Sequence, residues 1–476
     1  MDNLAPDIRV QTFSEVATGY TPQQAKAEAM RCLNCKNAPC VQGCPVAVKI
    51  PEFIEAIKND DNQKAREIIE QTNLLGDICG RVCPQERQCQ SKCVRGIKGD
   101  SIAIGRLERF AFDVTAPNST APDSTADFTT PEPDAKGEHA TNPQLNTKKV
   151  AIVGSGPAGL SCAATLAQAG IKVDVYEALH DFGGVLLYGI PNFRLPKNIV
   201  ANFIDNLKSK GVRLYNNVVV GKTIKLSKIY TDYDATFIGA GAGLPRFQGI
   251  PGEQLSGVYS ANEFLTRINL MHANRFPTFD TPVLIGDNVA IIGGGNVAMD
   301  AARCAIRSGA KHVTILYRRT EAEMPARAEE IEHAKEEGIE FKLLVNPLQI
   351  IGDDNGFVKS IELLKMQLGE PDSSGRRAPE PIPNSNFSLD VQTVVVAIGQ
   401  TPNPLIRRQA DHEQIPLNFN TKGCIVANED DFETSIDNVY AGGDIVTGAA
   451  TIILAMGAGR KAALSMIDKF KTHKQG

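Results

Sequence analysis

The 476-residue sequence contains no long hydrophobic run, few histidines and no excess of basic residues. Its longer apolar stretches, such as residues 451–458, are far shorter than the ~20 residues that cross a bilayer. A formal net charge of −5 disfavours binding to nucleic acid or to an anionic membrane. The first residues, MDNLAPDIRV, include acids and form no apolar signal segment, so we expect a cytoplasmic protein.

The residue patterns of hydrolytic enzymes are missing as well. The seven histidines are dispersed, and no Gly-x-Ser-x-Gly turn presents a serine nucleophile. Residue 2 is Asp2, whereas a glutamine-hydrolysing amidotransferase needs an N-terminal cysteine. We therefore expect this chain not to release ammonia from glutamine.

Cysteine, by contrast, is concentrated at the start of the chain. Eight of the eleven cysteines lie in the first hundred residues, in the runs Cys32-x2-Cys35-x4-Cys40-x3-Cys44-Pro45 and Cys79-x3-Cys83-Pro84-x4-Cys89-x3-Cys93. In two-cluster ferredoxins the last cysteine of a run ending in Cys-Pro ligates the other cluster. The spacing therefore predicts two intercalated iron–sulfur clusters, with Cys44 and a member of the second run exchanged between them.

Two other uses of these cysteines are weaker. Disulfides belong to oxidising compartments, which the start of the chain does not favour. Zinc sites can also contain Cys-x2-Cys. However, two four-cysteine runs that include Cys-Pro and have no interleaved histidines are more typical of iron–sulfur ligands. The scattered Cys162, Cys304 and Cys424 lie in apolar or glycine-rich contexts, where we expect small buried side chains.

The chain is long enough for about three domains. Residues 1–113 favour a helical iron–sulfur domain, with a capped helix from Thr21-Pro22 and two short amphipathic helices within residues 50–71. Residues 114–147 are rich in proline, serine, threonine and acids, which favours a polar linker over an ordered loop on the next domain.

After this stretch, strand–helix–strand patterns occur twice, from Lys149 and from Asn288, each with a glycine turn after its first strand. A third segment, residues 439–467, has a strand, a glycine turn and a long helix. We predict an FAD-binding domain in two parts, 148–285 and 401–476, interrupted by an NADPH-binding domain at 286–400. The fold class is thus a helical ferredoxin-like domain followed by two α/β Rossmann-like domains.

The first glycine turn is Gly154-x-Gly156-x-x-Gly159. Its glycines let the backbone approach a pyrophosphate, whose charge sits on free amides at the helix N-terminus. Glu177 ends the second strand, where a carboxylate that binds the ribose hydroxyls belongs. This unit should bind a dinucleotide.

The second turn is Gly293-x-Gly295-x-x-Ala298, and its second strand ends at Arg318 and Arg319 in place of an acid. Guanidinium groups pair with phosphate oxygens, so this site should prefer the 2′-phosphate of NADPH. Alternatively the pair is a solvated basic strand end, with Arg319 pointing away.

Two dinucleotides with different ribose partners imply a flavin beside a nicotinamide. NADPH gives up two electrons as a hydride and an iron–sulfur cluster accepts one, so a flavin between them makes an electron-transfer relay. The Gly443-Asp444 turn should then contact the flavin, with the amides of Thr451 and Ile452 facing its ring.

These motifs, together with GRVCPQERQC, GGVLLYGIPNFRLPK (183–197), YRRTEAEMPA and AGGDIVTGAA, closely resemble those of the glutamate synthase small (β) subunit family, from about residue 12 to the end. Similar architecture forms part of dihydropyrimidine dehydrogenase and of the large subunit of NADH-dependent ferredoxin:NADP oxidoreductases. The resemblance implies two [4Fe–4S] clusters, and FAD and NADPH domains like those of adrenodoxin and thioredoxin reductases.

The resemblance also implies ligands. One cluster would be held by Cys32, Cys35, Cys40 and Cys93, and the other by Cys44, Cys83, Cys89 and Glu108. The residues alone favour Cys79 over Glu108 as the fourth ligand of the second cluster. Arg194 should contact FAD, and Ile398 and Gly399 should lie near the nicotinamide. The residues predicted to bind FAD are Gly154, Ser155, Gly156, Pro157, Ala158, Gly159, Glu177, Gly184, Arg194, Gly443, Asp444, Thr451 and Ile452. Those predicted to bind NADPH are Gly293, Gly295, Asn296, Val297, Ala298, Arg318, Arg319, Ile398 and Gly399.

The predicted activity is electron transfer from NADPH through FAD and the clusters to a larger glutamate synthase subunit, which makes glutamate from glutamine-derived ammonia and 2-oxoglutarate. An alternative is the large subunit of a ferredoxin:NADP oxidoreductase, which can be electron-bifurcating, with another flavoprotein or ferredoxin as partner. A scaffold that has lost nicotinamide binding is disfavoured by the intact Gly293, Gly295, Arg318 and Arg319. The chain can also form an oligomer.

Overall fold

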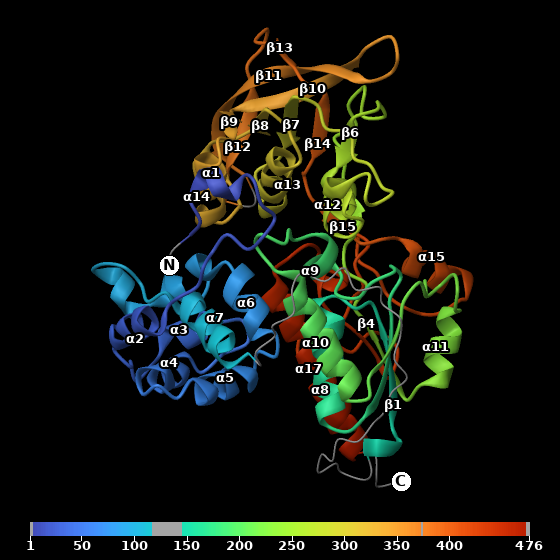
Figure 1. Cartoon of the computed structure of the whole chain (residues 1–476). Helices are drawn as coiled ribbons and strands as arrows, with labels where there is room; N and C mark the ends of the chain where they lie inside the picture. Colours follow the sequence, from blue (N-terminus) through green and yellow to red (C-terminus); the bar gives the residue numbers. More distant parts are fainter. Residues whose placement is uncertain (1–2, 117–144, 373–374, 473–476) are drawn as a thin grey trace.

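The structure is a computed structural model that describes residues 3–116, 145–372 and 375–472. Figure 1 shows a helical N-terminal part beside a lower α/β unit, with a second α/β unit above them. Most of the predicted linker, residues 117–144, lies outside the described residues. No helix in the described part of the chain is long and apolar enough to cross a membrane.

The N-terminal part is built from short helices around an apolar core. The hydroxyl of Thr21 accepts a hydrogen bond from the amide of Gln24, and the predicted capped helix begins at Pro22. The two amphipathic helices also form, and they bury Phe53 and Ile69 in one core with Leu107. The elements are α1 (Pro6–Arg9), α2 (Pro22–Met30), α3 (Pro39–Gln42), α4 (Ile50–Lys58), α5 (Asn62–Glu70), α6 (Gly76–Val82), η1 (Gln85–Arg87), η2 (Gln90–Lys92), η3 (Val94–Ile97) and α7 (Ile104–Thr115).

The lower α/β unit has a five-stranded parallel sheet in the order β16-β4-β1-β2-β3. Its central strands β1 and β4 are largely apolar and buried because helices cover both faces. Gly459 allows two of these helices, α8 and α17, to approach closely, since a Cβ there would lie 1.9 Å from the carbonyl oxygen of Ala158. The elements are η4 (Leu145–Thr147), β1 (Lys149–Val153), α8 (Pro157–Gln168), β2 (Lys172–Tyr176), α9 (Val185–Tyr188), α10 (Lys197–Ser209), β3 (Arg213–Tyr215), α11 (Leu226–Asp232), β4 (Ala235–Ile238), α15 (Leu405–His412), β16 (Val439–Ala441), α16 (Asp444–Thr447) and α17 (Ile452–Thr472).

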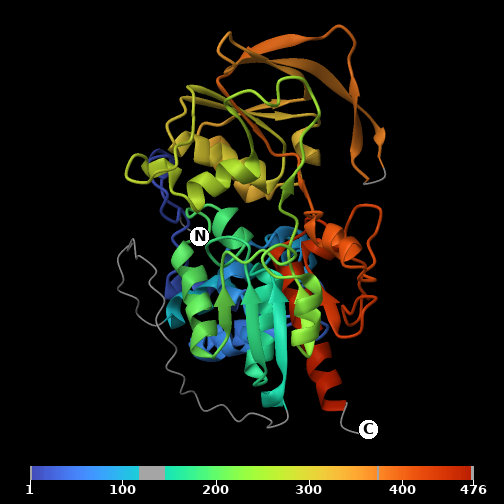
Figure 2. The ribbon, with the colours of Figure 1, turned by 90° about the vertical axis from the view of Figure 1, so that its right-hand side faces the viewer.

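The upper unit has a second parallel sheet in the order β6-β14-β7-β8-β9. Helices cover one face, and a small antiparallel sheet of β10 to β13 packs on the other and forms the top of the molecule (Figure 2). The elements are β6 (Val258–Ser260), α12 (Ala261–Asn269), η5 (Ala273–Arg275), β7 (Asn288–Ile292), α13 (Asn296–Arg307), β8 (His312–Tyr317), η6 (Glu321–Glu323), α14 (Ala328–Glu336), β9 (Glu340–Leu343), β10 (Val345–Gly352), β11 (Val358–Pro371), β12 (Arg377–Pro381), β13 (Phe387–Asp390) and β14 (Thr393–Val396).

The sequence ranges of the two units differ in one respect from the predicted ranges. Strand β6 and helix α12 lie within residues 148–285, which we predict as FAD domain, yet β6 pairs with β14 of the upper sheet and α12 packs in the upper core. Three residues without a glycine turn carry too little pattern to show which sheet they join. The crossings between the units, β5 (Leu244–Pro245) and β15 (Gln400–Thr401), pair with each other. The chain thus leaves the lower sheet after β4, builds the upper unit and returns through β16.

The iron–sulfur segment packs directly on the lower unit. Ile78 and Val82 of α6 share an apolar core with α10 and α17. A strap formed by residues 3–17 continues from this segment to the upper unit, where α1 lies beside α14 (Figure 1). The three parts therefore form a connected assembly around the site described next.

Candidate functional site

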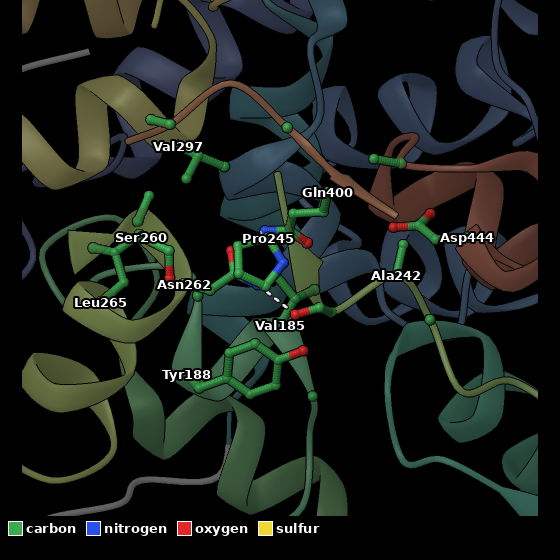
Figure 3. A pocket seen from close by; sticks show the side chains of 18 of the residues that line it. Val185, Tyr188, Ala242, Pro245, Ser260, Asn262, Leu265, Val297, Gln400 and Asp444 are labelled. Atoms are coloured by element: carbon green, nitrogen blue, oxygen red, sulfur yellow. Dashed lines mark hydrogen bonds between the residues drawn. The ribbon is translucent and has the colours of Figure 1, made fainter. Parts of the chain in front are cut away.

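A large cavity, of about 1560 Å³, lies between the two α/β units. Figure 3 shows that its wall combines Tyr188 from the lower unit, Asn262 from the upper unit and Gln400 from a crossing strand. Predicted residues that line it are Gly154, Gly156, Pro157, Ala158, Glu177, Gly184, Arg194, Gly443, Asp444, Thr451 and Ile452 from the FAD set, and Gly293, Gly295, Asn296, Val297, Arg318, Arg319, Ile398 and Gly399 from the NADPH set. Ser155, Gly159 and Ala298 are not in its wall.

The first glycine turn joins β1 to α8 at one end of this cavity. Gly154 has a φ of +96°, and a Cβ there would lie 2.6 Å from the carbonyl oxygen of Gly239. The carboxylate of Glu177 accepts hydrogen bonds from the amide and hydroxyl of Ser155, at 2.9 and 2.6 Å, and from the amide of Leu179. Ser155 therefore fixes the direction of Glu177 without itself reaching the cavity.

The C-terminal turn supplies another part of the wall. Asp444 accepts a hydrogen bond from the amide of Ala450, and burial raises the pKa of its carboxyl group. The hydroxyl oxygen of Thr451 is buried and has no hydrogen-bond partner among the described residues. A buried hydroxyl without a partner costs free energy unless a bound group satisfies it. This turn therefore suits a polar ligand.

The second glycine turn joins β7 to α13. Gly295 caps α13 without a side-chain hydrogen bond, so its first amides are available to an anion, as at the first turn. The side chain of Asn296 accepts a hydrogen bond from the amide of Arg327 at 2.9 Å. The amide of Ala326 donates to the carbonyl of Gly294. The loop of residues 324–327 is thus bound to the turn.

The two arginines predicted to select NADPH have different surroundings. Arg318 is exposed and lines the cavity. Arg319 is buried, and its guanidinium donates to the carbonyl of Arg377 and to the carboxylate of Asp372, at 2.7 and 2.5 Å. Arg376 lines the cavity as well. It was missed because only the β11–β12 hairpin, which shows no glycine-turn motif, brings it to the site.

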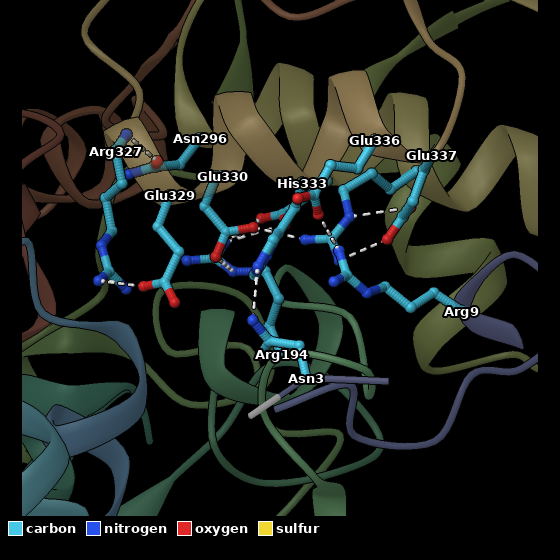
Figure 4. Close-up of polar contacts among 12 residues, drawn as sticks. Asn3, Arg9, Arg194, Asn296, Arg327, Glu329, Glu330, His333, Glu336 and Glu337 are labelled. Carbon is cyan, nitrogen blue, oxygen red and sulfur yellow. Dashed lines mark hydrogen bonds and ion pairs between the residues drawn. The ribbon is translucent and has the colours of Figure 1, made fainter. Parts of the chain in front are cut away.

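Arg194 connects the two units through a buried network of ion pairs (Figure 4). Its guanidinium contacts Asp300 of α13 at 2.7 Å and Glu330 of α14 at 2.8 Å. Glu330 also pairs with Arg303, which in turn pairs with Glu337. Arg194, which we predict to contact the flavin, lines the cavity, and its guanidinium is bound to Asp300 and Glu330.

The first cysteine set converges on one small pocket. Cys32, Cys35, Cys40 and Cys93 all line it, although Cys93 comes from the second run. Burial, together with a smaller effect of the neighbouring Cys93, raises the pKa of the Cys40 thiol to about 11. These four thiols are each partly accessible.

The second set is more deeply buried. Burial raises the pKa of the Cys89 thiol, and Glu108, Cys44 and Cys83 are near enough to raise it as well. Burial raises the pKa of Glu108 to about 8 against the effect of a hydrogen bond from Asn73. Cys79 is buried beside this set, and its thiol is hydrogen-bonded to Cys83.

A [4Fe–4S] cube bonds each thiolate through a different iron, whereas the ligands of a single ion share one atom. Within residues 3–116, 145–372 and 375–472, no three histidine, cysteine, aspartate or glutamate side chains group for a single ion.

The second cysteine run touches the cavity and the upper unit. Val82 and Pro84, on both sides of Cys83, line the cavity. Arg87 donates to the carbonyls of residues 324, 325 and 326 at 2.9 to 3.1 Å. In the opposite direction, Arg327 of the upper unit donates hydrogen bonds to the side chain of Gln85 and to the carbonyl of Arg81. The loop at the second glycine turn is therefore bound to the loop that carries Cys83.

Two family profiles match the chain. Residues 9–120 match the dihydropyrimidine dehydrogenase domain II, 4Fe-4S cluster, family, and residues 148–460 match the pyridine nucleotide-disulphide oxidoreductase family. Together they cover both the cysteine-rich segment and the two α/β units.

Curated relatives match nearly the whole chain. The glutamate synthase [NADPH] small chain of Escherichia coli is 36% identical over 96% of this chain and 93% of its own length. The NADP(+)-dependent formate dehydrogenase subunit beta of Moorella thermoacetica is 39% identical over 91% of this chain and 60% of its own length. Among solved structures, Mycobacterium tuberculosis FprA in complex with NADPH is 23% identical with a TM-score of 0.57, over 69% of this chain and 86% of that one, and so shares the fold.

Proposed function

Because the chain belongs to the glutamate synthase small-chain family of NADPH-dependent FAD and iron–sulfur oxidoreductases, we propose that it passes electrons from NADPH through FAD and two [4Fe–4S] clusters to a partner protein. The observation that carries this proposal is the shared cavity. One continuous space of about 1560 Å³ is lined by both glycine turns and by the residues on both sides of Cys83.

The residues at the lower end of the cavity fit FAD. Glu177 is held where its carboxylate can accept hydrogen bonds from the ribose hydroxyls. The N-terminus of α8 offers its free amides to the pyrophosphate. Asp444 and the unpartnered hydroxyl of Thr451 face the remaining part of the ligand. The bound flavin supplies the exchange between a hydride and single electrons.

The residues at the upper end fit NADPH. The amides at the start of α13 would hold its pyrophosphate, and Arg318 would contact the 2′-phosphate. We propose no direct phosphate contact for Arg319, because its guanidinium is bound to Asp372 and Arg377. Ile398 and Gly399 line the cavity between the two dinucleotides.

The burial of the two cysteine sets suggests their order. Cys83 of the second set adjoins the cavity, whereas the first set is partly accessible at the surface. We propose that Cys44, Cys83, Cys89 and Glu108 hold the cluster next to the flavin. Cys32, Cys35, Cys40 and Cys93 would hold the cluster that delivers electrons to the partner.

The partner that the relatives favour is a larger glutamate synthase subunit, which would reduce the imine formed from 2-oxoglutarate and ammonia. The observation that supports it is the match over nearly the full length of a glutamate synthase small chain. A second candidate is the same electron transfer to a different acceptor, as in a ferredoxin:NADP oxidoreductase. The similarity to a formate dehydrogenase subunit supports it, because such relatives serve other reactions.

Anaerobic titration with NADPH tests the activity. We expect NADPH to bleach the flavin absorbance and to produce the electron paramagnetic resonance signals of reduced clusters. Purified chain that contains flavin and iron but is not reduced by NADPH would refute the proposal. Isolation of the chain with its native partners under anaerobic conditions would then distinguish the two acceptors.

A further inference from the structure

Four large apolar side chains lie exposed near the first cysteine set. Met30, Leu33 and Ile97 have exposed fractions of 67%, 56% and 77%, and Val94 is also exposed. Leu33 and Val94 line the same pocket as the four cysteines. The side chain of Arg31 donates to the carbonyl of Asp100 at 2.6 Å and so ties the two segments together. We call these four residues the exit face.

The two segments that carry the exit face are rich in basic residues, although the whole chain has a formal net charge of −5. Residues 30–43 and 90–101 contain one acid, Asp100, and five bases: Arg31, Lys36, Lys92, Arg95 and Lys98. Arg31 pairs with Glu28. The other four bases are exposed and form no ion pair within the described part of the chain. Exposed cations without partners create a field that acts on an approaching protein.

An apolar centre with a charged rim is the usual composition of a protein–protein interface. We infer that the exit face docks an electron-acceptor protein whose redox centre lies beneath an acidic surface. This inference rests on the proposed function, because electrons must reach the first cluster before they can leave it. Oxidation of one NADPH to NADP+ and a proton releases two electrons, so two one-electron acceptors are each reduced once.

The exposed pocket beside Cys32 and Cys35 supports electron transfer from the first cluster to an acceptor at the surface. In the second set Cys83 and Cys89 are buried and only Cys44 is partly accessible, and Cys83 adjoins the cavity, so this set has less access to the surface than the first. Complementary charge mainly speeds association, by about ten- to a thousandfold, and this gain falls as salt increases. The rate of acceptor reduction should therefore depend strongly on ionic strength.

The test compares two acceptors with the full chain. We expect an acidic plant-type [2Fe–2S] ferredoxin to be reduced quickly at low salt, with a rate that falls as salt is added. A basic c-type cytochrome should be slower and should gain from added salt. The double variant Lys36→Glu/Lys98→Glu should lower the rate with ferredoxin by about tenfold and raise the rate with cytochrome. Lys359→Glu, an exposed position on β11 at the far end of the molecule, is the matched control.

Two further measurements separate docking from the earlier steps. Bleaching of the flavin by NADPH and the cluster resonance signals should be unchanged in the double variant. If NADPH fails to reduce wild-type protein, the clusters are reduced chemically and transfer to ferredoxin is still measured, so the two proposals fail separately. Rates that do not depend on salt, or equal losses in Lys359→Glu, would overturn the inference. So would self-association, or binding to phosphatidylserine vesicles, that Leu33→Ser abolishes while ferredoxin reduction is unaffected.

Discussion

Asn73 donates a hydrogen bond from its side-chain nitrogen to a carboxylate oxygen of Glu108 at 2.8 Å, and both side chains are buried. A buried carboxylate is costly unless it is paired, hydrogen-bonded or bound to a metal. The pKa values of the Cys44, Cys83 and Cys89 thiols are each raised in part by this carboxylate. Glu108 is therefore near enough to interact electrostatically with the three thiols that we propose as cluster ligands.

We predict that Glu108→Ala loses one cluster and that Cys79→Ala keeps both. Iron should fall from about eight to about four atoms per chain in Glu108→Ala, because the cube next to the flavin lacks its fourth ligand. Iron analysis and resonance spectra of anaerobic preparations measure this.

Glu108→Gln and Asn73→Ala are the matched controls. Glu108→Gln keeps the shape and one oxygen donor, so it should alter the resonance signal more than the iron content. Asn73→Ala removes the hydrogen bond to the carboxylate of Glu108 but keeps the carboxylate itself. Loss of a cluster in Cys79→Ala, with full iron in Glu108→Ala, would return Cys79 to the ligand set.

We predict that Arg318→Ala weakens NADPH binding by about ten- to a hundredfold and leaves NADH nearly unaffected. Hydrogen bonds to charged groups contribute about 1.5–3 kcal/mol, which corresponds to factors of this size. Flavin bleaching at graded concentrations of each nucleotide gives the affinities.

Arg319→Ala serves as the comparison for Arg318→Ala. Its side chain is bound to the β11–β12 hairpin, so its loss should loosen that hairpin, measured by hydrogen exchange, with a smaller change in NADPH preference. A larger loss of preference in Arg319→Ala than in Arg318→Ala would contradict this assignment.

The glycine turns were predictable because each is a local pattern, with the strand, turn and helix contiguous in sequence. The same holds for Glu177 and Arg318, which immediately follow β2 and β8. The convergence of Cys93 with Cys32 was not a local property, and it came from family resemblance. Contacts between segments that are distant in the sequence could not be predicted, because they too are not local properties. No periodicity in the chain indicates that Arg87 binds the loop of residues 324–327.

We predict that Arg87→Ala raises the KM for NADPH by about tenfold without loss of iron. Arg87 binds the loop that contacts Gly294, so its removal should free the loop at the nucleotide site. A tenfold change corresponds to about 1.4 kcal/mol, which suits the loss of exposed hydrogen bonds from a charged group. Hydrogen exchange should rise in residues 324–327. Lys64→Ala, an exposed lysine on α5 of the same domain, should leave the KM unchanged.

The buried ion pairs between α13 and α14 should make their local stability depend on pH. Burial alone would raise the pKa of Glu337, but hydrogen bonds from Arg307 and Arg303 hold it below its usual value. A carboxylate with a lowered folded-state pKa contributes stability above its unfolded pKa of about 4.3, and this contribution is lost as the pH falls through the folded value.

Amide hydrogen exchange in α13 and α14, followed from neutral pH to below pH 4, measures this dependence. It reports local opening, which suits a multi-domain chain better than a single unfolding temperature. We expect protection to fall with acid in the wild type and to be lower and flatter in Glu337→Gln. Arg303→Ala leaves two buried carboxylates without this partner and should cost ~3–5 kcal/mol of local stability at neutral pH. Equal protection in wild type and Arg303→Ala would show that the network does not stabilise these helices.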